Sequence, residues 1–462
     1  MIKCCRPDPG IDAFCSLLGR ALAGADEGPR RLQSLGGRPI HLTPSGRDGL
    51  RWLLRAAGIG EGDEVALPAL NCESIPDVIA AAGAKLVIFG NDPADFSPSL
   101  ASCRAALGPA VKVVVLPHLY GIPADLAGFA ELCRERKLLL IEDCAHCVRG
   151  TADGREVGSV GDAAIFSFSY DKPLSLGWGG ALSLSPALAA SLPPPAFPPM
   201  AEAEDRLVAA AFVVQHCMTD AALYERFLSV GYSLWQLLRH RELVPEVLKI
   251  VRRADAATAL PLWCREHMRP PMAGGARLFS RARRLASRVL SRALRPFAGP
   301  TRGGSDPIRT AMGGVAPAPG GLAMRLLAAQ DGLTRDCRGW ERRRRIAGIY
   351  LGGLDRKRLV VPVPPRPPAC WLRFPLAWRC RARERDQRCR EISAALKVEI
   401  GPFNWAAPLH RLPRFRSAAR VGPGVDETAA LMDGLVNLPV HSQVSEELAA
   451  ELVERINAAA AG

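Results

Sequence analysis

Short apolar segments alternate with longer amphipathic stretches between residues 47 and 184, and this alternation leaves few architectures open to the chain. The apolar segments indicate buried strands at 64–67, 85–89, 111–116, 138–141, 163–168 and 181–184. The stretches between them indicate helices near 47–57, 74–82, 97–107 and 124–136. Strands that alternate with helices form a mostly parallel sheet with helices on both faces. The sequence therefore predicts an α/β fold, in which ligands bind beyond the carboxyl ends of the strands.

Breaks in this pattern suggest how the 462 residues are divided. The proline-rich run at 191–199 cannot continue a helix, and a run rich in proline and glycine at 296–304 is typical of a linker. We expect four parts: a large α/β domain at 1–190, a helical insertion at 191–305, a long connecting helix region at 306–350 and a smaller C-terminal α/β domain at 351–462.

Two polar residues follow expected strands of the large domain. Asp143 ends the apolar stretch 138–143, and Lys172 lies shortly after the segment 163–168. A lysine amine and a buried carboxylate are the groups that pyridoxal phosphate requires from a protein. The amine bonds to the aldehyde of the cofactor, and the carboxylate pairs with its pyridinium nitrogen. Taken alone, Asp143 is also compatible with a helix N-cap and Lys172 with an ordinary surface lysine.

Short motifs occur in order around these two residues. They are PSGR at 44–47, GEGDEVALP at 60–68, HLYGIPAD at 118–125, IEDCAH at 141–146, GSVGD at 158–162, FSF at 166–168, GG at 179–180, PLH at 408–410 and LPVH at 438–441. In content and order they resemble the DegT/StrS-type sugar aminotransferases, a branch of the aspartate aminotransferase superfamily. The resemblance implies a fold-type-I, pyridoxal-phosphate-dependent transferase that acts as a homodimer.

The resemblance also implies which residues hold the cofactor. Lys172 matches the lysine that binds the aldehyde and moves the substrate proton, and Asp143 matches the partner of the ring nitrogen. Ser167 matches a phosphate-binding serine. Ser45, Gly46 and Arg47 open a helix whose first amide groups could bind the same phosphate, because a helix N-terminus attracts anions.

Three of the matched positions depart from the family pattern. Arg47 stands where threonine is usual, and it could bind phosphate, reach the substrate or remain solvated. His146 stands where glutamine is usual beside the cofactor's phenolic oxygen, and it could donate a hydrogen bond there or pack in the core. Cys72 stands where many members place an aromatic ring on the pyridine, and a thiol cannot stack in the same way.

The substrate side of the resemblance is less complete. The counterpart of the family's Gly-Tyr-Asn-x-Arg-Met stretch, which reaches into the neighbouring subunit, is the unrelated segment 311–320. That contact is either absent or supplied from elsewhere, for example by Arg47. Three residues lie in segments that border the substrate in the family, and each could contact substrate or serve packing: Trp405, His410 and His441.

Charge and cysteine content limit which other partners, such as lipid, nucleic acid or metal, can be expected. The net charge is +14. The segment 277–295 contains seven arginines, most of them at helical spacing, and no acidic residue. This segment is either an ordinary surface helix or a contact for anionic lipid headgroups or a phosphorylated glycan carrier. Nucleic acid is not expected, because aromatic residues are not interleaved with the arginines and no groove-reading motif accompanies the charge. The single Cys144-x-x-Cys147 pair lacks a second pair at zinc-site spacing, so we expect no metal.

The start of the sequence lacks the apolar core of a secretory signal, and no apolar run reaches the ~20 residues of a membrane helix. We therefore expect a cytoplasmic protein, with peripheral contact at the inner membrane face as an open alternative. The expected activity is transfer of an amino group from an amino acid, such as glutamate, to a keto-sugar linked to a nucleotide, in polysaccharide or glycoconjugate biosynthesis.

Two rival functions remain on the same fold. Sugar dehydratases of this type replace the lysine with histidine, and Lys172 argues against that activity. A catalytically idle relative that serves as a scaffold in glycan assembly is favoured by Cys72 and by the unmatched segment 311–320. Lys172, Asp143 and Ser167 oppose it.

Overall fold

A computed structural model of the chain describes residues 33–202, 317–335, 338–363, 369–402, 407–416 and 419–461, together with isolated positions elsewhere. Most of the expected helical insertion at 191–305 lies outside the described residues, and so do the basic segment 277–295, Trp405 and residues 311–316.

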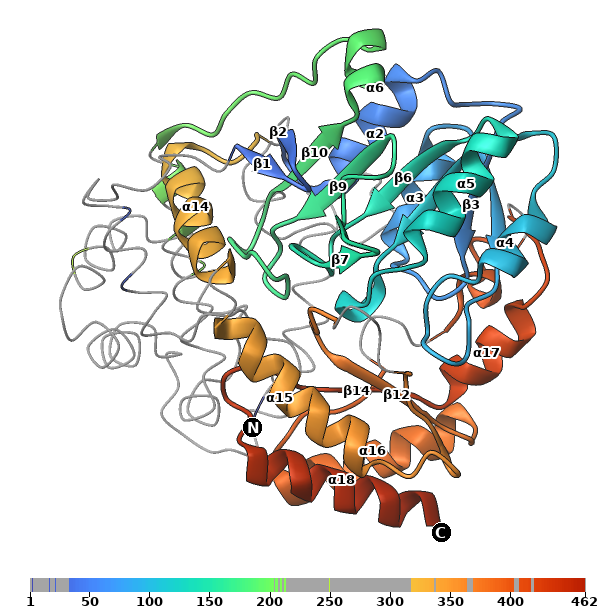
Figure 1. Cartoon of the computed structure of the whole chain (residues 1–462), viewed down its shortest axis with the longest axis vertical. Coiled ribbons are helices and arrows are strands. Elements are labelled where there is room, and N and C mark those ends of the chain that lie inside the picture. The colour runs from blue at the N-terminus through green and yellow to red at the C-terminus, as the bar shows by residue number, and fades with distance from the viewer. Residues whose placement is uncertain are drawn as a thin grey trace, which may run out of the picture.

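A nine-stranded sheet forms the centre of the described structure (Figure 1), in the order β1-β2-β10-β9-β6-β5-β3-β4-β13. Its strands are β1 (Ser34–Leu35), β2 (Arg38–Thr43), β3 (Glu64–Pro68), β4 (Lys85–Phe89), β5 (Val111–Pro117), β6 (Leu139–Asp143), β9 (Ala163–Ser167), β10 (Gly180–Leu184) and β13 (Ala419–Val421). Neighbours from β9 through β13 are parallel, whereas β10 is antiparallel to both β9 and β2. The prediction of a mostly parallel sheet is confirmed.

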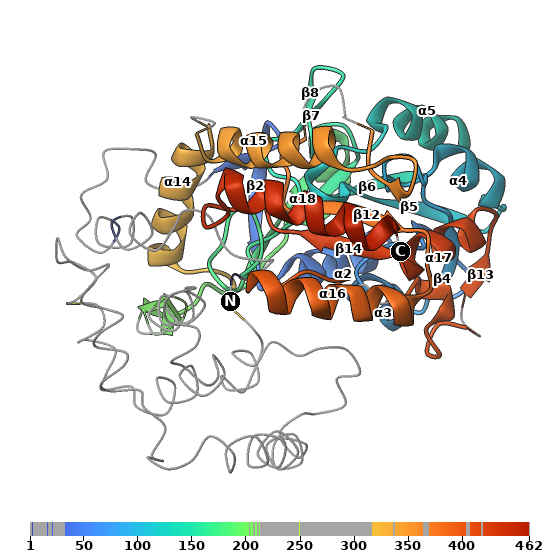
Figure 2. The same ribbon diagram turned by 90° about the horizontal axis from the view of Figure 1, so that it is seen from below.

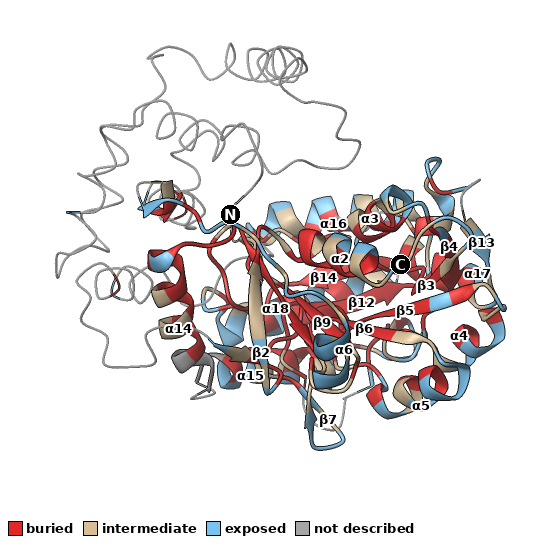
Figure 3. Ribbon diagram, turned by 90° about the horizontal axis from the view of Figure 1, so that it is seen from above, coloured by how far each residue is buried: buried red, intermediate tan, exposed pale blue. Residues whose placement is uncertain are grey.

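Helices cover both faces of this sheet because alternate strand residues point to opposite sides. The helices are α2 (Gly46–Ala56), α3 (Ser74–Ala81), α4 (Leu100–Ala106) and α5 (Leu126–Arg136). On one face Leu50 and Leu54 of α2 pack with Val65 of β3. On the other face Phe129 of α5 packs with Ala66, the next residue along the same strand. Figure 3 shows the central strands, such as β6 and β9, almost wholly buried, whereas helices such as α2 and α3 carry both buried and exposed residues.

Shorter elements complete the large unit. They are the 3-10 turn η1 (Leu119–Gly121), the hairpin strands β7 (Thr151–Ala152) and β8 (Arg155–Glu156), and the helices α6 (Pro186–Ser191) and α14 (Gly321–Arg335).

The C-terminal part has its own three-stranded antiparallel sheet, and its apolar core also includes residues of the large unit such as Leu119, Tyr120 and Ile122. The sheet contains β11 (Leu359–Val360), β12 (Phe374–Trp378) and β14 (Leu435–Leu438). Three of its helices lie side by side in Figure 2: α15 (Arg338–Gly353), α18 (Glu446–Ala461) and α16 (Ala382–Leu396). Two further elements are the 3-10 turn η3 (Leu409–Arg411) and the helix α17 (Val425–Asp433).

Two features bear on the expected division at residue 351. Tyr350 of α15 donates a hydrogen bond to the Pro439 carbonyl and packs in the C-terminal core, so we propose that α15 belongs to the small unit. In addition, β13 leaves that unit and pairs with β4 at the edge of the large sheet. No helix within the described residues combines the length and apolar character that a membrane crossing requires.

Candidate active site

A cavity of about 660 Å³ opens at the carboxyl ends of the parallel strands β3, β5, β6 and β9. The eight residues expected to hold the cofactor all line it: Ser45, Gly46, Arg47, Cys72, Asp143, His146, Ser167 and Lys172. They come from the N-terminus of α2 and from three segments at the ends of β3, β6 and β9, and the parallel sheet brings these segments to one edge.

The carboxylate of Asp143 is buried at the end of β6, with only 6% of the residue exposed. Its Oδ1 accepts a hydrogen bond of 3.0 Å from the backbone N–H of Ala145. Burial raises the pKa of Asp143, although the Ala145 amide and the nearby Lys172 amine oppose this effect. A cationic or proton-donating ligand in the cavity would therefore relieve an unfavourable buried charge.

His146 lies in the same loop and is also buried. Burial, together with the positive charges of Lys172 and Arg373, lowers the pKa of His146 well below its usual value. The imidazole is therefore neutral near pH 7, where it carries one N–H donor. This is compatible with a hydrogen bond to an anionic oxygen of a ligand, which was one of the two roles expected for this residue.

The part of the cavity wall formed by the start of α2 has the features of an anion-binding site. Ser45 is the N-cap of α2. Its hydroxyl accepts a hydrogen bond from the Asp48 amide and donates one to the Asp48 carboxylate, so it caps the helix. A Cβ at Gly46 would lie 3.0 Å from the Phe166 carbonyl oxygen, and one at Gly180 would lie 2.3 Å from Gly46 N. These two glycines let the start of α2 lie against the end of β9 and the start of β10. The first amides of a helix have no intrahelical acceptor, so they can bind an anion there.

A hydroxyl pair borders this anion-binding site. Ser167 Oγ lies 3.0 Å from Ser169 Oγ, and both residues line the cavity. Ser169 was missed by the sequence analysis, although it follows Ser167 at the spacing that places two side chains on the same side of an extended segment.

The amine of Lys172 has a neighbour that the sequence analysis also missed. Lys172 Nζ lies 3.3 Å from Asp171 Oδ2, which in turn lies 2.9 Å from an amino group of Arg373. Arg373 comes from the C-terminal part, immediately before β12. One feature of the sequence could have indicated Arg373: it interrupts the apolar run 369–378, and a charged residue buried in such a run requires a partner.

Of the residues expected to contact substrate, the structure describes His410 and His441, and neither is among the residues that line this cavity. His441 is buried, and its Nδ1 accepts a 3.3 Å hydrogen bond from the Gln443 amide. His410 lies in η3, where burial and Arg411 lower its pKa. From the C-terminal part, Arg414 lines the cavity instead, paired with Glu73 at 2.8 Å and Asp77 at 3.2 Å.

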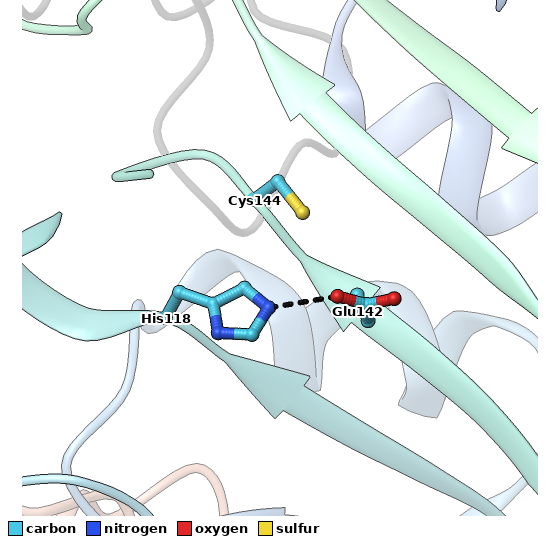
Figure 4. Close-up of side chains that lie close together, drawn as sticks. All are labelled: His118, Glu142 and Cys144. Carbon is cyan, nitrogen blue, oxygen red and sulfur yellow. Dashed lines mark hydrogen bonds and ion pairs between the residues drawn. The ribbon is translucent and has the colours of Figure 1, made fainter. Parts of the chain in front are cut away.

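Next to the cavity, His118, Glu142 and Cys144 form a buried cluster whose donor atoms lie close enough to suggest a metal site (Figure 4). The carboxylate of Glu142, however, accepts hydrogen bonds from the backbone amides of Gly158, Val160 and Gly161, at 2.6 to 2.9 Å. The ring of His118 accepts one hydrogen bond from the Ala124 amide at Nδ1, so Nε2 carries the proton and donates to Glu142 at 3.0 Å. These bonds explain the cluster as support for the loop after β8.

Known proteins match two stretches of this chain. The sequence pattern of the DegT/DnrJ/EryC1/StrS aminotransferase family matches residues 39–192 and 331–457. GDP-perosamine synthase from Caulobacter vibrioides is 37% identical over 139 residues, which are 30% of this chain and 38% of that protein. A dTDP-4-dehydro-2,3,6-trideoxy-D-glucose 4-aminotransferase from Saccharopolyspora spinosa is 37% identical over 136 residues, which are 29% of this chain and 35% of that protein. The alignments thus span less than two-fifths of either relative.

The crystal structure of the aminotransferase TlmJ from Streptoalloteichus hindustanus is similar over 100% of this chain and 99% of that chain, with a TM-score of 0.62 and 23% identity. This likeness shows the fold, and it confirms the fold-type-I prediction. The two segments that carry the family pattern make up more than half of the sequence and contain every residue expected to hold the cofactor. The chain belongs to the DegT/DnrJ/EryC1/StrS aminotransferase family.

Proposed function

We propose that the chain is a pyridoxal-phosphate-dependent aminotransferase that moves an amino group from an amino acid, such as glutamate, to a keto-sugar linked to a nucleotide. One observation carries this proposal. An amine (Lys172), a buried carboxylate (Asp143) and an anion-binding site at the start of α2 line the same cavity. These three features fit the aldehyde, the ring nitrogen and the phosphate of the cofactor.

When bound, pyridoxal phosphate supplies an electron sink for the carbon that loses or gains a proton. The chain's own residues would do the rest. Asp143 would hold the ring nitrogen in its protonated form. The neutral His146 would donate a hydrogen bond to the phenolic oxygen. Lys172 Nζ would carry the proton to and from the substrate carbon as a general acid and base. Ser167 and the first amides of α2 would fix the phosphate.

The substrate class rests on similarity and on size. The relative from S. spinosa is named as an aminotransferase for a dTDP-linked 4-dehydro sugar, and the relative from C. vibrioides as a synthase of a GDP-linked product. A cavity of about 660 Å³ lies within the ~300–1,000 Å³ typical of small-molecule sites. Both points support a keto-sugar nucleotide for this chain as well.

The setting of the enzyme follows from the same resemblance. We propose a homodimer that works in the cytoplasm, in the assembly of a surface polysaccharide or glycoconjugate. Sedimentation equilibrium tests the dimer, which would have twice the chain mass of 49.6 kDa. Contact of the segment 277–295 with an anionic membrane surface belongs to the proposal, and the Discussion gives its test.

A catalytically idle scaffold is the second candidate, and Cys72 is the observation that favours it. The residue lines the cavity where an aromatic ring is usual, and its thiol lies 3.1 Å from the Ser74 hydroxyl. A protein without the aromatic ring would bind the pyridine more weakly.

A visible absorption spectrum separates the two candidates. We expect the purified protein, incubated with pyridoxal phosphate and then freed of unbound cofactor, to be yellow and to lose the colour when glutamate is added. A keto-sugar nucleotide should then restore it. Lys172→Ala should abolish the band, whereas Lys112→Ala, which changes an exposed lysine of β5, should leave it intact. A protein that retains no colour after incubation with millimolar cofactor and removal of the unbound cofactor would refute the enzyme proposal and favour the scaffold.

A further inference from the structure

We propose that Asp171 and Arg373 form a positioning pair that sets the charge at Lys172 Nζ, so that the C-terminal unit controls the reactive amine. The inference rests on the proposed function of Lys172. It assigns roles to two residues that the sequence motifs around Lys172 do not indicate.

The geometry places one carboxylate between two cations. Asp171 Oδ2 lies 2.9 Å from an amino group of Arg373 and 3.3 Å from Lys172 Nζ. The exposed side-chain fractions are 2% for Arg373, 22% for Asp171 and 14% for Lys172. Because water is largely excluded, each charge acts on the other two with little screening.

The backbone around Arg373 is fixed against the large unit. The amides of Cys370 and Leu372 donate to the carbonyls of Gly121 and Tyr120 in η1, at 2.9 and 2.8 Å. Arg343 of α15 donates to the carbonyls of Trp371 and Leu372 from the other side, at 3.0 and 2.9 Å. These hydrogen bonds hold the segment 370–372 of the C-terminal unit against η1, and this segment positions the guanidinium of Arg373 beside Asp171.

Asp171 remains ionised in this arrangement. Burial by itself would raise the pKa of Asp171, but Lys172 and Arg373 outweigh it, so the pKa lies below its usual value. The other titratable groups near Lys172 are Asp143, whose pKa burial raises, and His146, which is neutral near pH 7. Asp171 is thus the carboxylate in direct contact with the amine.

The two members of the pair act on Lys172 in opposite directions. The carboxylate of Asp171 favours a positive charge on Nζ and holds the amine in place by a hydrogen bond. Arg373 partly neutralises that carboxylate and so weakens its preference for the charged amine. A general base must lose its proton readily, and an amine facing Asp171 without Arg373 would hold its proton more tightly. Asp171 therefore fixes the position of the Lys172 amine, and Arg373 keeps that amine from holding its proton too tightly.

The test is the pH at which the visible spectrum of the protein loaded with pyridoxal phosphate changes by half. Asp171→Asn keeps the shape of the side chain and removes the charge, so this midpoint should fall by about one pH unit, a tenfold change in the proton equilibrium. Arg373→Gln should raise the midpoint, because Asp171 is then no longer neutralised. Arg373→Lys keeps the positive charge and should return the midpoint towards that of the unchanged protein.

A matched control breaks another buried pair that does not touch Lys172. Arg149 and Asp331 bond at 2.8 to 2.9 Å, with exposed side-chain fractions of 16% and 4%. Asp331→Asn should lower stability without moving the spectral midpoint. Midpoint shifts of the same sign in Asp171→Asn and Arg373→Gln, or no shift in either, would overturn the inference.

A second measurement does not need the cofactor. The full chain freed of pyridoxal phosphate is treated with an amine-reactive reagent over a range of pH, and labelling of Lys172 is followed by peptide mass spectrometry. Asp171→Asn should make Lys172 reactive at lower pH, and Arg373→Gln should require higher pH; unchanged profiles would contradict the pair. If the unchanged protein binds no cofactor, the proposed function fails, but this labelling still decides whether the pair sets the charge of the amine.

Discussion

At the scale of single residues, Asp143 shows how a binding site works against the stability of the empty protein. Its carboxylate is buried, and burial raises its pKa above that in the unfolded chain. The charged form is therefore disfavoured in the folded state, and this cost is present at every pH above the folded-state pKa. It decreases as the pH falls through that pKa towards the value of the unfolded chain.

We expect Asp143→Asn to raise the thermal midpoint of the cofactor-free protein at pH 8, and the gain to shrink as the pH approaches 4. The same substitution should weaken binding of pyridoxal phosphate at least tenfold, because the partner of the ring nitrogen is lost. Differential scanning calorimetry across this pH range, with and without cofactor, measures both effects. A destabilised cofactor-free variant at pH 8 would show that the Asp143 charge is already compensated.

Sequence reasoning reached Asp143 and Lys172 because each follows an apolar run that can be recognised as a strand. It did not reach Arg373, because the contact with Asp171 joins positions that are 202 residues apart and depends on how the C-terminal unit docks. His410 and His441 illustrate the same difficulty. Local motifs indicated them, but which C-terminal residues line the cavity is decided by tertiary packing, and Arg414 is one that does.

At the scale of elements, the turn η1 determines how the C-terminal unit meets the cavity. Tyr120 and Gly121 both have positive φ, at 61° and 86°. This reversal turns two carbonyls towards the segment that carries Cys370 and Leu372. A Cβ at Gly121 would lie only 2.0 Å from the Cys370 carbonyl oxygen. Only glycine allows both the positive φ at position 121 and the close approach of the Cys370 carbonyl.

Gly121→Ala should therefore lower the free energy of unfolding by about 2–4 kcal/mol, from backbone strain and from the clash with Cys370. Urea denaturation measures this loss. Gly348→Ala is the matched control, because Gly348 lies inside α15 and its added Cβ would meet no atom within 4 Å. That variant should be more stable by about 0.5–1 kcal/mol. Equal stability of Gly121→Ala and the unchanged protein would contradict the role of η1.

The strands of the sheet core were predictable from sequence, whereas its edges were not. The six apolar segments became β3, β4, β5, β6, β9 and β10, because a strand buried on both faces is apolar throughout. The edge strand β13 contains only three partly exposed residues, Ala419–Val421, and has no such signature. The antiparallel direction of β10 also depends on pairing that its sequence does not encode.

At the scale of the whole molecule, charge is the property that the fold does not explain. The net charge is +14, and seven arginines without an acid lie in the segment 277–295. If this segment contacts anionic headgroups, each arginine near the surface contributes about 1 kcal/mol. Such binding weakens with salt, because the Debye length falls to about 8 Å at physiological ionic strength.

Replacing these seven arginines by glutamine should reduce binding to vesicles that contain anionic lipid by at least tenfold at low salt. Co-sedimentation with vesicles measures this, and vesicles of zwitterionic lipid alone serve as the control. The cofactor spectrum of the variant should be unchanged. Equal binding before and after the replacement would leave the segment as an ordinary basic surface.

The family pattern lies on both sides of the segment that sets this charge, and the cavity is built from the two flanking parts. The chemistry proposed for it depends on one covalent attachment, between Lys172 and the cofactor. Borohydride reduction of the protein loaded with pyridoxal phosphate, followed by digestion and mass spectrometry, locates that attachment. We expect the phosphopyridoxyl group on the peptide that contains Lys172 and on no other. A label on a different lysine, or no label at saturating cofactor, would contradict the assignment of this cavity as the active site.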